Sequence, residues 1–392
     1  MRIGIVTDTY TPQVNGVTTV VRRIVTLLAA KGHTAAVVAP RYPDYRDSTA
    51  DYFHATGGAE LRLASVPFPL YPDIRLSLPR FRRVAEFFDA CQPQLIHVHT
   101  EGALGLAGRR YAARRAVPLV TSFHTDFPRY ARHYGLGAFA PAVWRWLEWF
   151  HRPASLTLTP GTAVRAELAD RGIAHAAVWG RGVDTRQFHP GRRDPSWRRW
   201  LAGGDDTAIV LHVGRLAPEK NLDVLVEALR LARKALGQRA TFVVAGEGPY
   251  ATRIEARLPF VRRLGFLPRQ HLAKLYASAD VCVFPSHTET CGLVALEAMS
   301  SGASVIAADA GGLRESVRHD ETGLLVRPHD PLAYLEAIIA LVRDPSRRVA
   351  LAAAAREHVV LARDVAVEDA ELLERYACLI GPPGTGVVRC AA

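Results

Sequence analysis

Short apolar runs alternate with amphipathic stretches along the first half of the chain. Five runs have the length and composition of buried strands: Ile3–Val6, Ala35–Ala39, Leu95–Val98, Leu119–Ser122 and Leu156–Thr159. The stretches between them have helical spacing. One example is Thr18–Ala30, which is followed by Gly32, a residue typical of helix ends. Strands that alternate with helices in this way predict a parallel sheet with helices on both of its faces.

The second half of the chain repeats this alternation. Its predicted strands are Ala208–Val213, Thr241–Ala245, Val281–Pro285, Ser304–Ala307 and Gly323–Val326. A helical pattern covers Leu222–Leu236, between the first two of these strands. Both halves are therefore expected to be doubly wound α/β units.

The segment Arg181–Pro195 interrupts the pattern with glycine, proline and charged residues, as inter-domain linkers do. We place the linker at residues 186–195, between a first domain over 1–185 and a second domain over 196–366. A helix over 367–380 is expected to pack back on the first domain. Residues 381–392 are expected to form a tail.

The composition is that of a soluble globular protein. Of 392 residues, 49% are hydrophobic and 22% are charged, and no apolar run is long enough to span a bilayer. The five cysteines are an odd number without C-x-x-C spacing, which argues against a disulfide scaffold or a structural zinc site. The opening MRIGIVTDTY lacks a signal-peptide pattern, so the predicted location is the cytoplasm.

The net charge of +11 lies almost entirely in the first half of the chain. Arginine and aromatic residues gather there in Arg75–Arg83, Arg109–Arg115 and Pro128–Arg152. This pattern favours peripheral association with an anionic membrane surface, at the inner face of the cytoplasmic membrane. In the competing interpretation Trp144 and Phe150 are core residues and the arginines form a solvated face. An arginine-rich coding bias would also raise the charge.

The segment Pro285–Glu315 holds the largest set of candidate binding residues. A turn with Glu289, Cys291 and Gly292 follows a strand and leads into a helix at about Leu293, with Glu297 one turn further on. A glycine turn before a helix offers free N–H groups to phosphate or sugar oxygens, and a carboxylate can bind the two hydroxyls of a ribose. A capped helix with solvated glutamates would explain the same residues.

A second candidate segment is His212–Leu229. Its strand ends at Val213, and Arg215 and Lys220 flank the turn that follows. Two positive charges at the carboxyl end of a parallel strand suit a diphosphate. A charged surface turn would look similar.

Several linked motifs resemble one family, the retaining glycosyltransferases of family four. They are GRLAPEKN, ETCGLVALEAM with its two glutamates eight positions apart, GG-x-x-E, TDTYTPQVNGV, FHTDF and GVD-x-x-x-F. The resemblance covers nearly the whole chain. It implies the GT-B fold, in which two Rossmann-like doubly wound domains face each other across a cleft.

The resemblance also implies roles for particular residues. Arg215 and Lys220 would bind the donor diphosphate, and Glu297 would hold the ribose hydroxyls. The donor-binding residues also include Gly16, Glu289 and the backbone of Cys291, Gly292 and Leu293. The catalytic set would comprise His124, Arg215, Lys220 and Glu289, with His124 beside the sugar and the acceptor. Cys291 departs from the family pattern, where an aromatic residue is common.

No cofactor or metal is expected, because the nucleotide-sugar is the substrate. The sequence has no Asp-x-Asp motif, and Arg215 and Lys220 can neutralise the leaving diphosphate. His97 and His99 alternate at a strand end, and a metal site there is the less favoured interpretation.

The sequence therefore predicts a retaining transferase that moves a hexose from a nucleotide-sugar, most simply mannose from GDP-mannose, to a lipid or glycan acceptor. Alternatives are a glucosyl, glucuronosyl or sulfoquinovosyl transferase that uses a UDP-sugar, and a sugar-nucleotide epimerase. No nucleic acid is expected as a partner, because no nucleic-acid module accompanies the basic residues.

Overall fold

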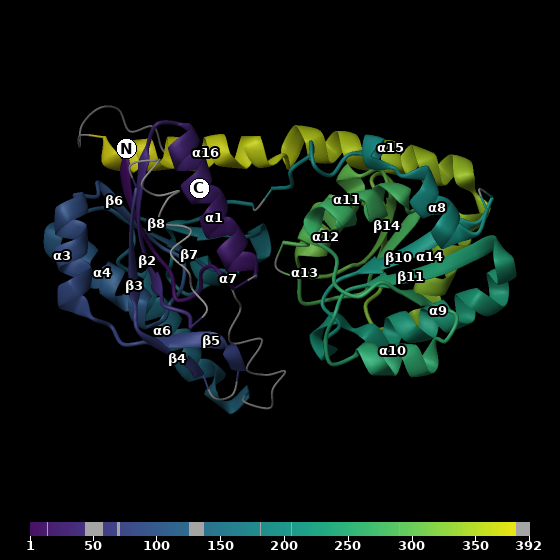
Figure 1. The fold of residues 1–392 in the computed structure, drawn as a ribbon, viewed down its shortest axis with the longest axis horizontal. Coiled ribbons are helices and arrows are strands. Elements are labelled where there is room, and N and C mark those ends of the chain that lie inside the picture. Colours follow the sequence, from purple (N-terminus) through teal and green to yellow (C-terminus); the bar gives the residue numbers. More distant parts are fainter. Residues whose placement is uncertain are drawn as a thin grey trace. The chain divides into compact units, whose positions relative to one another are not determined.

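A computed structural model describes residues 1–13, 15–43, 58–68, 71–124, 137–180, 182–204, 206–289 and 291–381. The chain forms two compact units, one of Met1–Trp179 with Asp369–Ala392 and one of Gly180–Glu368 (Figure 1). Parts of the FHTDF motif and of Pro128–Arg152, and the predicted tail beyond Gly381, lie outside the described residues. Among the described residues, no helix combines the length and the apolar character needed to cross a membrane.

The first unit contains a seven-stranded parallel sheet with the order β3-β2-β1-β6-β7-β8-β9. Its strands are β1 (Arg2–Val6), β2 (Thr34–Pro40), β3 (Ala59–Leu63), β6 (Leu95–Val98), β7 (Leu119–Ser122), β8 (Leu156–Thr159) and β9 (Ala176–Val178). The five predicted strands are confirmed as β1, β2, β6, β7 and β8. The prediction missed the edge strands β3 and β9 and the antiparallel pair β4 (Ser65–Phe68) and β5 (Tyr71–Ser77).

Helices cover both faces of this sheet (Figure 1). They are α1 (Gly16–Ala30), α3 (Phe81–Cys91), α4 (Ala103–Arg115), η2 (Gly137–Phe139), α6 (Ala140–His151), α7 (Thr162–Asp170) and the greater part of α16 (Val365–Ile380). Side chains alternate along β1, as they must in a strand. Ile3 and Ile5 pack with α1 on one face, whereas Val6 packs with α3 and α4 on the other. Leu372 and Tyr376 of α16 are buried in the first of these cores.

The second unit contains a six-stranded parallel sheet with the order β12-β11-β10-β13-β14-β15. Its strands are β10 (Ala208–Val213), β11 (Ala240–Ala245), β12 (Arg262–Arg263), β13 (Val281–Phe284), β14 (Ser304–Ala308) and β15 (Leu324–Val326). All five predicted strands are present, with ends that agree to within one residue. Two hydrophobic cores lie one on each side of the sheet.

The helices of the second unit lie before, between and after its strands along the chain (Figure 1). They are η3 (Pro190–Arg192), α8 (Pro195–Ala202), η4 (Pro218–Lys220), α9 (Leu222–Leu236), η5 (Gly237–Arg239), α10 (Ala251–Arg257), α11 (Arg269–Ser278), α12 (Leu293–Ser300), α13 (Gly311–Ser316), α14 (Pro331–Arg343) and α15 (Pro345–Ala362). The predicted helix at Leu222–Leu236 is confirmed as α9.

The segment predicted as a linker, residues 186–195, lies within the second unit. Val183 and Phe188 are buried in the second unit's core, and the N–H of Val183 donates to the carbonyl of Arg363 at 2.9 Å. The change from one unit to the other occurs instead at Gly180 and again after Glu368. The side chains of Val183 and Phe188 and one backbone hydrogen bond therefore attach this segment to the second unit, although its composition is that of a linker.

The strand orders mark where ligands bind in such sheets. In an open parallel sheet the ligand lies outside the carboxyl ends of the strands, where the strand order changes direction. That point lies between β1 and β6 in the first unit and between β10 and β13 in the second. The loops after these strands carry the candidate residues described next.

Candidate donor-binding pocket

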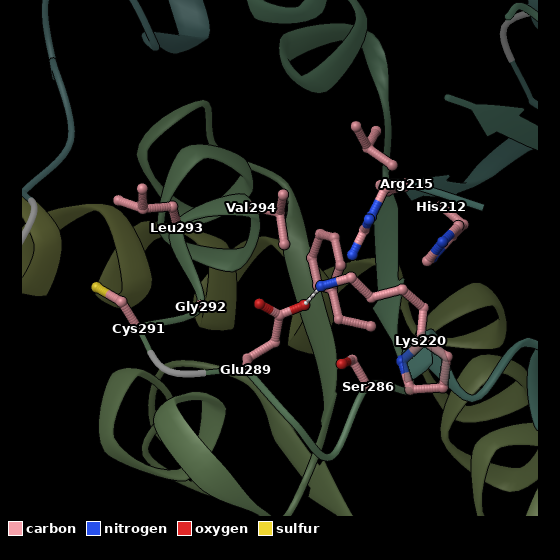
Figure 2. A pocket seen from close by; sticks show the side chains of 13 residues that line it. His212, Arg215, Lys220, Ser286, Glu289, Cys291, Gly292, Leu293 and Val294 are labelled. Carbon is pink, nitrogen blue, oxygen red and sulfur yellow. Dashed lines mark hydrogen bonds and ion pairs between the residues drawn. The ribbon is translucent and has the colours of Figure 1, made fainter. Parts of the chain in front are cut away.

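A pocket of about 180 Å³ lies at the carboxyl ends of β10 and β13 (Figure 2). The start of α12 closes one side of it. Its lining includes Arg215, Lys220, Glu289, Cys291, Gly292 and Leu293, six of the predicted donor-binding residues. Gly16 and His124 belong to the first unit, and Glu297 lies deeper in α12.

An ion pair between Lys220 and Glu289 spans the pocket. Lys220 Nζ donates to Glu289 Oε1 at 2.5 Å, and both side chains are mostly shielded from solvent (Figure 2). Two further bonds join the same loops. Asn221 Nδ2 donates to the carbonyl of Pro285 at 3.2 Å, and Thr288 Oγ1 donates to the carbonyl of Glu219 at 3.1 Å. The loops after β10 and β13 are therefore fixed to each other.

Arg215 supplies a second positive charge at this edge of the sheet. Its guanidinium forms an ion pair with the buried carboxylate of Glu219, four residues further along the chain. Its side chain remains partly exposed in the pocket. The pocket thus places two cations side by side, each next to one carboxylate, which is a setting that an anionic ligand can enter by competing for the cations.

The turn before α12 depends on two glycines. Gly292 has a φ of +67°, and a Cβ at this position would come within 2.9 Å of Leu313 Cδ2. Gly311, the first glycine of GG-x-x-E, has a φ of +52°, and its Cβ would lie 2.6 Å from the carbonyl oxygen of Glu289. The N–H of Gly312 donates to that carbonyl at 2.7 Å. The GG motif therefore supports the loop that carries Glu289.

The N-cap residue of α12 is Gly292, which has no side chain to cap the start of the helix. Its first residue, Leu293, lines the pocket, so the positive end of the helix dipole lies next to it. The carbonyl of Cys291 accepts a hydrogen bond from Ser316 Oγ at 3.1 Å. Cys291 is buried and lines the pocket.

Glu297 is buried within α12. Its Oε1 lies 3.2 Å from Arg269 Nη1 at the start of α11. Burial raises the pKa of Glu297 to about 7, and the guanidinium of Arg269 opposes that rise. Sequence reasoning missed Arg269, because it lies outside the motifs and far from Glu297 in the chain.

His212 is a second residue that the sequence analysis did not assign. It is buried at the end of β10, lines the pocket and donates from Nδ1 to the carbonyl of Val283 at 2.8 Å. Burial lowers the pKa of His212 to about 4, so the ring is neutral near pH 7. Its Nε2 is buried without a hydrogen-bond partner among the described residues. A ring nitrogen in this state can only accept a hydrogen bond.

The first unit contains the other two predicted site residues, Gly16 and His124. Gly16 is the first residue of α1, and the preceding Asn15 caps the helix by accepting from the N–H of Thr18 at 2.9 Å. His124 directly follows the residue after β7, and it is buried. Its neighbours Thr125 and Asp126 lie outside the described residues.

Three histidines, His97, His99 and His124, are packed together at the carboxyl ends of β6 and β7. His99 Nδ1 lies 3.0 Å from His124 Nε2, and the rings of His97 and His99 are 3.8 Å apart. His97 bonds to Ser122 Oγ at 2.7 Å and to the hydroxyl of Tyr376 at 2.5 Å. Burial lowers the pKa of His99 to about 3. A neutral His99 can therefore fix the orientation of the His124 ring through one hydrogen bond.

Metal ligation was the less favoured interpretation of His97 and His99. Both form hydrogen bonds with protein side chains. Within the described ranges, no group of three or more histidine, cysteine, aspartate or glutamate side chains is arranged to hold a metal ion.

Comparison with family models divides the chain in the same two parts. The Glycosyltransferase Family 4 model matches residues 14–187, and the model described as glycosyl transferases group 1 matches residues 195–358. Their boundary lies close to the change between the two structural units.

Similar proteins match most or nearly all of the chain. A GDP-mannose-dependent alpha-mannosyltransferase of Mycobacterium tuberculosis is 36% identical, and the alignment covers 97% of both chains. The sulfoquinovosyl transferase SQD2 of Arabidopsis thaliana is 35% identical over 75% of this chain and 58% of its own. Among solved structures, Alr3699/HepE of Anabaena in complex with UDP superposes with a TM-score of 0.77 at 21% identity, over 96% of this chain and 100% of that one.

The burial of Glu297 predicts a pH dependence of stability. The pKa of this carboxyl is 4.5 when unperturbed and about 7 in the fold. Between these values the folded state binds the additional proton, so stability falls as the pH rises through this window. Relative to Glu297→Gln, the wild type should lose about 2–3 kcal/mol of unfolding free energy between pH 5 and pH 8. Urea denaturation at both pH values measures this difference.

Glu336→Gln is the matched control, because Glu336 is exposed on α14. Its stability should follow that of the wild type at both pH values. If Glu297→Gln also follows the wild type, burial does not raise the pKa of Glu297.

Proposed function

This chain is a glycosyltransferase of family four with the two-domain α/β architecture called GT-B, and we propose that it transfers mannose from GDP-mannose with retention of configuration. The observation that carries the proposal is the pocket of Arg215, Lys220, Glu289 and α12 at the switch point of the second sheet. The mannosyltransferase relative, which matches over 97% of both chains, supports the choice of donor.

The diphosphate would bind between Arg215, Lys220 and the start of α12. Lys220 forms an ion pair with Glu289, and the oxygens of a bound diphosphate would attract the Lys220 ammonium. Arg215 offers a planar fork for two phosphate oxygens. When the diphosphate also interacts with Lys220, the carboxylate of Glu289 can accept hydrogen bonds from sugar hydroxyls.

The proposed transfer needs no base from the protein. The bond between the anomeric carbon and the β-phosphate oxygen breaks, and the acceptor oxygen forms a bond to that carbon on the same face. The acceptor proton passes to the departing phosphate oxygen. Arg215, Lys220 and the helix start stabilise the negative charge that develops on the diphosphate. Because these groups supply positive charge, the proposal includes no metal or cofactor.

Glu297 is proposed to hold the ribose. A buried carboxylate can accept hydrogen bonds from both hydroxyls of a vicinal diol, which would replace the solvation that it loses in the fold. Arg269 would keep the carboxylate charged when the nucleoside is bound. Gly16 and His124 are proposed to contact the donor phosphate, the sugar and the acceptor, as the family resemblance implies.

A lipid or glycan is the proposed acceptor, reached at the inner face of the cytoplasmic membrane. Exposed Trp146 and Trp149 on α6, 40% and 46% exposed, support an interfacial position. Trp144 and Phe150 of the same helix are core residues, as the competing interpretation required. The relationship to SQD2 supports the alternative of another sugar, carried by UDP, on a glycolipid.

Donor binding tests the choice of base. In the presence of EDTA, GDP and GDP-mannose should stabilise the protein, by about 2.7 kcal/mol at a concentration 100 times the dissociation constant. UDP, ADP and their sugar conjugates should have little effect. Thermal-shift titration measures this stabilisation. If UDP or a UDP-sugar stabilises the protein more strongly, the donor is a UDP-sugar and not GDP-mannose.

Removal of the Lys220 charge tests the diphosphate site. Lys220→Ala should lower the rate of transfer by about 100- to 1000-fold, because the enzyme loses a positive charge that stabilises the anionic leaving group. Lys234→Ala removes the same charge from the exposed face of α9 and should retain wild-type turnover. Near-normal turnover of Lys220→Ala would exclude Lys220 from leaving-group stabilisation.

The configuration of the product tests the mechanism. The new glycosidic bond should have the anomeric configuration of the donor. Proton NMR of the initial product reports this directly through the coupling constants of the anomeric carbon and its proton. An inverted product would require a general base, which the proposal does not contain.

A further inference from the structure

A second cavity lies in the first unit, away from the residues assigned to donor binding and catalysis. This α4 groove has a volume of about 600 Å³ and runs along α4 between the start of α3 and the end of α6. Leu119 and Ser155 in its lining stand at the amino ends of β7 and β8. His99 and His124 follow the carboxyl ends of β6 and β7, so the groove is at the opposite edge of the sheet.

The wall of the α4 groove is mainly apolar. It is formed by Phe81, Leu106, Ala113, Val117 and Trp149 among others. Trp149 is 46% exposed, and the ring of Trp146, also exposed, lies 5.1 Å from it. A volume of this size is within the range of small-molecule sites, about 300–1000 Å³. The groove therefore offers an apolar channel with two tryptophans beside it.

Two arginines in this wall have no carboxylate partner within 4.0 Å in the described part of the chain. They are Arg109 and Arg110, whose guanidinium groups lie 3.8 Å from the ring centre of Trp149 and 4.8 Å from that of Phe81. Arg109 donates only a long bond of 3.3 Å, from Nη2 to the carbonyl of Trp149. Its Nε is buried, and no hydrogen-bond acceptor among the described residues faces it.

Two other arginines of the first unit differ from this pair. Arg115, in the same helix, forms an ion pair with Asp89, and Arg171 does so with Glu148. Burial lowers the pKa of Arg109, which reflects the cost of a cation that is partly removed from water. An anion in the groove would relieve this cost by supplying acceptors for Nε and for the uncompensated charges.

We propose that the α4 groove binds one anionic membrane lipid, with its acidic headgroup at Arg109 and Arg110 and an acyl chain along the apolar wall. A free phosphate would satisfy the arginines but would leave the apolar channel unfilled. The two exposed tryptophans suit the membrane interface, where rings of this kind lie at the level of the headgroups. The basic balance of the first half of the chain favours an anionic surface.

The groove lipid is an anchor and not the acceptor. It would lie at the amino edge of the sheet, whereas transfer is assigned to residues at the carboxyl edges. The inference rests on the membrane association included in the proposed function. It does not depend on the identity of the donor sugar or on transfer itself.

Binding of a monomeric short-chain lipid tests the groove. Dihexanoyl phosphatidylglycerol, kept below its micelle concentration, should bind the full chain in isothermal titration calorimetry, and dihexanoyl phosphatidylcholine should bind far more weakly. The double variant Arg109→Gln/Arg110→Gln should bind the anionic lipid about 10- to 30-fold more weakly. The absence of binding by the wild type would overturn the proposal.

Two controls separate the groove from general attraction to positive charge. Arg22→Gln/Arg165→Gln removes the same charge from α1 and α7, outside the groove, and should bind as the wild type does. Ala113→Phe retains every arginine but fills the channel from an exposed position on α4, and it should abolish binding. The proposal is overturned if both arginine double variants lose the same lipid affinity, or if Ala113→Phe binds the lipid as the wild type does.

Stabilisation by GDP, measured on the same samples, separates this proposal from the proposed function. All groove variants should retain the nucleotide response of the wild type, which also shows that they are folded. A nucleotide response without lipid binding would contradict the groove alone. Lipid binding without a response to any nucleotide would contradict the proposed donor site and leave the groove in place.

Discussion

The ion pair of Lys220 and Glu289 is the interaction on which the candidate donor site depends. It joins the loops after two neighbouring parallel strands, whose register pairs Val210 with Val281. Both side chains are mostly shielded from solvent, and the cost of removing two charges from water offsets much of their attraction, so the main consequence of the pair is positional. It holds a cation at the carboxyl edge of the sheet before any ligand arrives, while Gly311 and Gly312 hold the loop that carries the anion.

The strands of both sheets could be predicted because most of them are buried on both faces. Such a strand is a continuous apolar run, and the predicted Ala208–Val213 coincides with β10. Three of the four edge strands carried no such signal. β12 consists of two arginines, β9 has three residues, and β3 alternates charged with apolar side chains. The structural role of residues 182–195 was also hidden, because Val183 and Phe188 are two apolar residues in a segment rich in glycine, proline and charged residues.

The motif residues of the site could be located from sequence, but their partners could not. Lys220 and Glu289 are 69 positions apart, and no local pattern states that they touch. The same is true of Arg269 beside Glu297 and of His99 beside His124. On α6 the tryptophans divide by helical phase. Trp144 packs inward while Trp146 and Trp149 face outward, and the number of aromatic residues alone could not separate core from surface.

The two cavities use arginine and lysine in opposite ways, and the difference bears on selectivity. In the candidate donor pocket each cation already has a carboxylate partner, so a small anion must compete with that carboxylate and gains little. Only a ligand with further contacts, such as a sugar and a nucleoside, recovers the loss. In the α4 groove the two arginines have no carboxylate partner among the described residues, so selectivity among anions must come from the apolar wall. Cations that already have carboxylate partners favour a reactant that exchanges at every turnover, whereas the arginines of the α4 groove favour a ligand that remains bound.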